Sequence, residues 1–160
     1  MNRHNPRPQA GFSLIELLIV VAIIGIIAAL AIPNLLAARR AANEATAVSG
    51  IRTVSSVEET YRATYGSGVR FADFAELVAR QMIDSSLASS TTVASAKSGY
   101  VYSLVLPTAD LSAYCVGNAP ATANTGTRNF STDQPGVIYV HALDVANPPT
   151  STDGGEPMKQ

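Results

Sequence analysis

A long, almost uncharged apolar run near the N-terminus constrains this chain more than any other feature. Between Leu14 and Ile32 the only charged residue is Glu16, and Leu, Ile, Val and Ala supply nearly everything else. As an α-helix, residues 12–32 would span about 30 Å, the thickness of the hydrocarbon core of a bilayer. The run therefore predicts a membrane-spanning helix. It leaves Glu16 to be explained, since a charge within such a span costs about 2.5–3.5 kcal/mol.

One interpretation of the N-terminus is an ordinary secretory signal. Arg3 and Arg7 would form its charged region, and residues 29–31 (Ala-Leu-Ala) its small-x-small cleavage site. Against this, the apolar run begins with a glutamate, continues beyond the cleavage site and is followed closely by Pro33. The product in that case would be a secreted or membrane-tethered binding module cleaved after Ala31.

The other interpretation rests on Gly-Phe-Ser-Leu-Ile-Glu at residues 11–16, which resembles the processing site of type IV prepilins and type II secretion pseudopilins. The resemblance continues through the apolar run, Pro33 and the helix predicted after it. It implies that residues 1–11 are a leader, which prepilin peptidase removes by cutting between Gly11 and Phe12. It also implies that the peptidase methylates the new amine of Phe12 and that the apolar segment stays in the mature chain.

The orientation of the span follows from this resemblance. Charge does not decide it, because Arg3 and Arg7 flank one end and Arg39 and Arg40 flank the other. The family resemblance implies a precursor held by lipid in the inner membrane, with its leader in the cytoplasm. An inner-membrane assembly platform would then polymerise it with other pilin subunits into an extracellular filament, the pilus. The alternative within the family is the major pseudopilin of a type II secretion system.

We expect Glu16 to act in assembly together with Phe12. After cleavage, the positive amine of Phe12 would lie one helical turn before Glu16, and the amine of a docking subunit would neutralise Glu16 of its neighbour. Because apolar helices slide freely past one another among lipid tails, such a pair would set the axial register. The simpler alternative is that Glu16 lies at the end of the span and reaches headgroup water.

Residues 12–65 contain no turn signal and predict one long helix with two halves. Residues 12–33 would form the transmembrane or filament-core half, and residues 34–65 the amphipathic half. Pro33 lacks a backbone donor and clashes with the preceding turn, so we expect a kink or local unwinding there, with a second soft point at Gly25. The resemblance implies that this interval loses helical order when subunits pack.

The amphipathic half carries a narrow apolar stripe that needs a cover. Its members, with Glu58 inside the same arc, are Ala47, Ile51, Val54, Tyr61 and Tyr65. We expect the stripe to pack in the core of a head domain. The charged residues Arg39, Arg40, Arg52 and Glu44 are expected to face neighbours or solvent.

Residues 66–146 predict a small α+β head in which an antiparallel sheet packs on the long helix, as in pilins. The periodicities indicate a helix near residues 71–81 and strands near residues 100–106, 113–118 and 137–143. A turn-rich connection is expected over residues 118–136. Residues 147–160 hold three prolines and two glycines and are expected to form a flexible tail whose deletion leaves the head folded.

A second resemblance, less specific than the first, lies in the head. Gly-Thr-Arg-Asn-Phe at residues 126–130, followed by Asp133 and by Gly-Val-Ile at residues 136–138, is similar to a pattern in some bacterial pilin and pseudopilin heads. The chain departs from many pilins in its cysteines. Cys115 is alone, so no disulfide can close the C-terminal loop.

The remaining sequence does not indicate an enzyme. A Cys115–His141 dyad would lack a third orienting group, and Asp133, Asp144 and Asp153 match no defined calcium loop. Removal of the leader leaves 9 Lys and Arg against 12 Asp and Glu, a side-chain charge of −3 that offers no basic field to nucleic acid. We expect no catalytic residue, no cofactor, no metal site and no nucleic-acid partner.

Overall fold

The computed structural model describes residues 11–107, 109 and 111–159, and most of the expected leader lies outside them. The chain divides into two compact units, the first ending at Ala37 and the second beginning at Ala38. Helix α1 (Leu14–Thr64) contributes to both. The other elements are α2 (Phe74–Ala79), α3 (Ser85–Ala88), the 3-10 helix η1 (Val93–Ser95), β1 (Tyr100–Val105), β2 (Cys115–Pro120), β3 (Asn129–Asp133), β4 (Tyr139–His141) and β5 (Glu156–Pro157).

In the first unit, α1 is apolar on all sides, and its large side chains from Leu14 to Leu36 are exposed. Among the described residues, α1 is the helix long and apolar enough to cross a membrane, by its length and composition. At Pro33, where a kink or local unwinding is expected, the residues on both sides are helical. The side-chain amide of Asn34 donates to the carbonyl oxygen of Leu30 at 3.1 Å, next to the carbonyl of Ala29 that has no N–H donor from Pro33.

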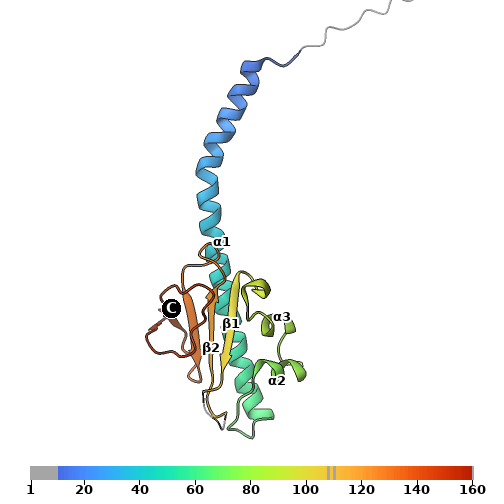
Figure 1. Ribbon diagram of the computed structural model, residues 1–160, viewed down its shortest axis with the longest axis vertical. Helices are drawn as coiled ribbons and strands as arrows, with labels where there is room; N and C mark the ends of the chain where they lie inside the picture. Colours follow the sequence, from blue (N-terminus) through green and yellow to red (C-terminus); the bar gives the residue numbers. More distant parts are fainter. Residues whose placement is uncertain (1–10, 108, 110, 160) are drawn as a thin grey trace, which may run out of the picture. The chain divides into compact units, whose positions relative to one another are not determined.

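In the second unit, five strands form an antiparallel sheet in the order β1-β2-β3-β4-β5, and one face of it packs on the C-terminal half of α1 (Figure 1). The register pairs Tyr102 with Asn118, whose side-chain amide donates to the carbonyl oxygen of Ala47 in α1 at 2.9 Å. A long helix packed against a small antiparallel sheet confirms the predicted α+β fold class.

The predicted apolar stripe of α1 forms the centre of the head core. Four of its five members are buried, together with residues from three strands: Ala47, Ile51, Val54, Tyr61, Tyr100, Tyr102, Val116 and Phe130. Tyr65 is the exception, because it is 52% exposed at the end of the helix. The stripe thus covers the inner face of the sheet, and burial of side chains of this size contributes about 1.5–3 kcal/mol each.

Strand β3 lies within residues 118–136, which were expected to be a turn-rich connection. Its sequence, Asn-Phe-Ser-Thr-Asp, has one apolar residue, Phe130, and this side chain enters the core. The polar Asn129 and Ser131 point to the outer face, where each is nevertheless buried. The strand was missed because its outer side chains bind other backbone and side-chain groups rather than solvent.

The described residues 147–159, which the sequence predicts to be a flexible tail, make specific contacts with the head. Asn129 is 1% exposed and donates its side-chain amide to the carbonyl oxygens of Asp144 and Asn147, at 2.9 and 3.1 Å. A Cβ at Gly117 would strike the backbone of Pro149, so the segment lies directly on the outer face of β2. Strand β5 then pairs with β4 at the sheet edge. Hydrogen bonds therefore hold a segment that offers few apolar side chains.

Truncation after Ala146 is accordingly expected to destabilise the head. It would leave the buried amide of Asn129 short of one acceptor and remove β5, and each buried polar group left unpaired costs about 1–3 kcal/mol. We expect the melting temperature to fall by about 10 °C or more, measured by the near-ultraviolet signal of the tyrosines. Lys159→Ala, an exposed position in the same segment, should leave it unchanged. An unchanged melting temperature after truncation would contradict this packing.

Candidate assembly site

The N-terminal end of α1 places Phe12, Ser13 and Glu16 together. Phe12 is 83% exposed, and Ser13 is the last residue before the helix. The backbone N–H of Ser13 donates to Oε2 of Glu16 at 2.9 Å, while the N–H groups of Glu16 and Leu17 donate to the carbonyl oxygen of Ser13 at 3.1 and 3.3 Å. Glu16 thus closes the first turn of its own helix, where the helix dipole also favours a carboxylate.

This local role of Glu16 was not predicted, although the sequence carries its signal. A serine followed three residues later by a glutamate, just before an apolar run, is the capping-box pattern. The carboxylate is exposed in the single chain and lies one helical turn from Phe12. The arrangement gives Glu16 a backbone partner within its own chain that an amine from another subunit would have to replace or supplement.

Gly25 and Pro33 lie in the same apolar part of α1. A Cβ placed at Gly25 would meet no atom within 4 Å, so no contact within the chain requires a glycine there. Any requirement for Gly25 must come from backbone freedom or from other molecules. The loss of helical order expected between these two residues concerns the assembled state and stays a prediction.

Glu44 is a structural anchor rather than a solvent-facing residue, which corrects the sequence expectation. It is 7% exposed and accepts from the backbone N–H and hydroxyl of Thr127, at 2.8 and 2.6 Å, and from the guanidinium of Arg128 at 2.7 Å. Burial acts to raise its pKa, but these hydrogen bonds outweigh burial and lower it. Arg40 was misassigned in the same way, since it donates to the side-chain oxygen of Asn124 at 3.1 Å.

Glu58 is a buried carboxyl group in the middle of the apolar stripe. It is 0% exposed, its Oε2 accepts from the N–H of Ala72 at 3.0 Å, and no partner is found for Oε1. Burial raises its pKa to about 7, and the neighbouring carboxylates of Asp73, Glu59 and Glu76 add to the effect. Its presence in the stripe was noted from the sequence, but its burial was not expected.

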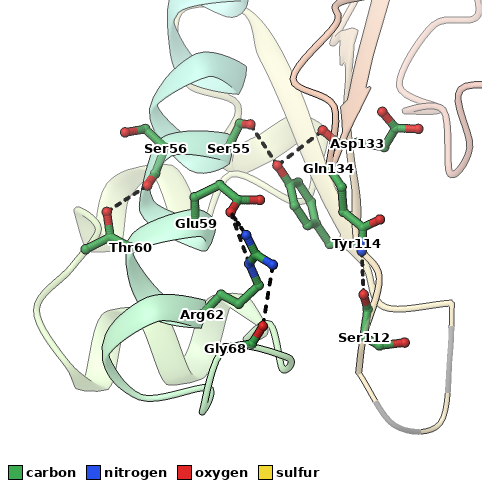
Figure 2. A network of polar contacts seen from close by, with 10 residues as sticks. All are labelled: Ser55, Ser56, Glu59, Thr60, Arg62, Gly68, Ser112, Tyr114, Asp133 and Gln134. Carbon is green, nitrogen blue, oxygen red and sulfur yellow. Dashed lines mark hydrogen bonds and ion pairs between the residues drawn. The ribbon is translucent and has the colours of Figure 1, made fainter.

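A network of polar contacts joins the C-terminal end of α1 to the sheet (Figure 2). The hydroxyl of Tyr114 lies 2.7 Å from Oγ of Ser55 and donates to the carbonyl oxygen of Asp133 at 3.3 Å. Beside it, Arg62 donates to Glu59 at 2.7 Å and to the carbonyl oxygen of Gly68 at 3.4 Å. These contacts hold helix, loop and strands together.

The two residues considered as a catalytic dyad have separate surroundings. Cys115 lies in β2 and His141 in β4, with β3 between them. Nε2 of His141 is 2.6 Å from Oγ of Ser131, and burial lowers the pKa of the imidazole. Burial also raises the pKa of the Cys115 thiol to about 11, and the carboxylates of Asp133 and Asp153 raise it further. The thiol is therefore protonated near neutral pH.

Two of the three aspartates considered for calcium accept hydrogen bonds from neighbouring side chains. Asp133 accepts from the hydroxyl of Thr152 at 3.2 Å, and Asp144 accepts from the amide of Asn147 at 2.9 Å. No group of three or more His, Cys, Asp or Glu side chains that could hold a metal occurs among the residues that the structure describes.

Comparison with known proteins shows what the N-terminal part of the chain is similar to. Residues 6–32 match the family model of the prokaryotic N-terminal methylation motif. Over 56 residues, 35% of this chain, it is 50% identical to the type IV wide pilus major component PilA4 of Thermus thermophilus, covering 43% of that protein. Over 75 residues, 47% of the chain, it is 39% identical to the type IV major pilin protein PilA of Myxococcus xanthus, covering 32% of that protein.

A third relative belongs to a secretion system. The chain is 38% identical to the type II secretion system core protein G of Aeromonas hydrophila over 56 residues, which is 35% of this chain and 39% of that protein. The matches span less than half the length of these relatives. No solved structure matches the chain.

The matched methylation motif and the exposed apolar helix occur together in the N-terminal segment of the chain. In its N-terminal segment the chain is similar to type IV pilins and to type II secretion pseudopilins. The resemblance predicted from residues 11–16 is confirmed by these matches.

Proposed function

We propose that this chain is a structural subunit of a type IV pilus-like filament. The observation that carries the proposal is the match of residues 6–32 to the methylation motif, together with the large apolar side chains from Leu14 to Leu36 of α1, which are exposed in the described part of the chain. Prepilin peptidase cuts between Gly11 and Phe12 and methylates the amine of Phe12. The subunit waits in the inner membrane until the assembly platform moves it into the filament.

The physical basis of assembly is the exposed surface of α1 in the first unit. Its large apolar side chains are roughly 50–80% exposed in the single chain, which is costly in water. Lipid covers this surface in the membrane, and the equivalent helices of other subunits cover it in the filament. The head in the second unit is folded independently of this exchange and forms the outer surface.

A pseudopilus of a type II secretion system is the second candidate, and the match to core protein G favours it. That match and the pilin match to PilA4 have the same length, 56 residues, so length does not separate the two candidates. Deletion of the gene separates them. Loss of surface filaments with normal protein secretion indicates a pilus, and loss of secretion indicates a pseudopilus.

The processing step has a direct test. Mass analysis of the mature protein is expected to give N-methylated Phe12 as the first residue. Gly11→Leu should leave the uncut precursor in the membrane, because a bulky side chain blocks the cleavage site. Ala31→Leu is the matched control, since it alters only the small-x-small site of an ordinary secretory signal. Mature protein beginning at Ile32 would contradict the proposal.

A further inference from the structure

One flank of α1 in the second unit carries an arginine at the junction of three adjoining hollows. These have volumes of about 410, 190 and 360 Å³, and Arg52 lines all of them. The hollows run between α1 and the segment from β3 to β5. The side chains and backbone around Arg52 include Val48, Ser56, Gly136, Ile138 and Met158.

The charge of Arg52 is uncompensated within the described part of the chain, where this side chain makes no hydrogen bond or ion pair. The other charged groups along the hollows are paired. Arg128 lies 2.7 Å from Glu44, and Arg62 lies 2.7 Å from Glu59. The hollows therefore present the unpaired positive charge of Arg52 among apolar and small polar groups. Such a surface suits a partner segment in which a carboxylate is flanked by apolar residues.

The opposite face of the same sheet presents such carboxylates. The segment from Asp144 to Gly155 covers this outer face, through the contacts of Asn129 and Gly117 described above. Asp144 and Asp153 are exposed on it. The two faces thus differ in sign, with the unpaired Arg52 on the α1 side and the exposed carboxylates of Asp144 and Asp153 on the outer side.

A filament of identical subunits requires two different surfaces that fit one another, because a head-to-tail contact repeats without closing. We propose that the Arg52 hollow of one subunit receives the acidic C-terminal segment of the next subunit, with Asp144 or Asp153 paired to Arg52. The inference rests on the proposed function, because it describes the contact between heads in the same filament. Val48 and Met158 at the hollow would keep water from the ion pair.

Charge reversal in the full chain tests this contact. Arg52→Glu is expected to reduce the amount of sheared surface filament at least about tenfold, because like charges then face one another. Thr53→Glu, which places the same charge on the adjacent exposed position outside the hollows, should assemble normally. Near-ultraviolet circular dichroism and membrane levels should be unchanged in both variants. A second reversal, Asp144→Arg or Asp153→Arg, is expected to restore assembly of Arg52→Glu.

The outcomes are distinct. Normal filaments from Arg52→Glu would overturn the contact while leaving the proposed function intact. Loss that neither second reversal restores would overturn the acidic segment as the partner. A wild-type chain that is processed at Gly11 and forms no filaments would overturn both the proposed function and this contact.

Discussion

Replacement of Glu16 by alanine is expected to leave the chain inserted and cleaved but to abolish filament formation. In the mature subunit the amine of Phe12 becomes a positive charge within one helical turn of Glu16, in surroundings where charges attract strongly. Packing of apolar helices alone does not choose an axial register, because lipid tails compete equally well. Filament yield by electron microscopy and the mass of the mature N-terminus are the measurements.

The contact between Ser13 and Glu16 gives the alanine variant a competing explanation. Glu16→Ala removes both the charge and the acceptor for the N–H of Ser13, 2.9 Å away. Glu16→Gln separates the two roles, because its side-chain oxygen still accepts from that N–H while the charge is gone. We expect Glu16→Gln to be as defective as Glu16→Ala, whereas a capping role alone predicts that it assembles normally.

The head provides the control for these variants. Glu16 lies in the first unit, so neither substitution should alter the melting temperature of the head. Co-expressed wild-type subunits should rescue Glu16→Ala in part, since each contact needs one amine and one carboxylate. Normal filament yield from Glu16→Ala would contradict a role of Glu16 in assembly. It would favour the simpler interpretation, in which Glu16 lies at the end of the span and reaches headgroup water.

The features that the sequence predicted well depend on neighbours along the chain. The apolar run, the processing motif and the stripe of α1 are patterns within one helix, so each is visible from spacing alone. The fold class followed because a helix with an apolar stripe must be covered, and because strands were predicted near residues 100–106 and 113–118. These features define the candidate assembly site almost completely.

The features that were missed depend on contacts between distant segments. Glu44 binds Thr127 and Arg128, which are more than 80 residues away. The residues next to Glu44 in the sequence do not predict these partners. Strand β3 and the contacts of the C-terminal segment were missed for the same reason. In a sequence, polar residues that hydrogen-bond to each other cannot be told from polar residues that face solvent. Because Cys115 is alone, the sequence indicated a C-terminal loop that no disulfide closes. In the structure, Asn129 holds that loop by hydrogen bonds to Asp144 and Asn147.

Glu58 carries the second large expectation, a dependence of head stability on pH. Its pKa rises from an ordinary 4.5 to about 7 on folding, mainly through burial. A carboxyl whose pKa is raised in the folded state stabilises it fully below pH 4.5, and this contribution is lost as the pH rises through about 7. The difference corresponds to about 3 kcal/mol, so the head should unfold more easily at pH 8 than at pH 5.

Glu58→Gln tests this directly, because glutamine keeps an acceptor for the N–H of Ala72 and cannot ionise. We expect the variant to lose most of the wild-type difference in unfolding free energy between pH 5 and pH 8, and to be the more stable of the two proteins at pH 8. Denaturant unfolding of the full chain in detergent would measure this through its six tyrosines, all of which lie in the second unit. Glu59→Gln is the matched control, since that side chain is 39% exposed and pairs with Arg62. It should keep most of the wild-type pH dependence, because burial, and not the charge of Glu59, is the main cause of the raised pKa of Glu58. An equal slope with pH in wild type and Glu58→Gln would mean that the buried carboxyl keeps an ordinary pKa, and that water or movement of the Ala72 segment reaches Oε1.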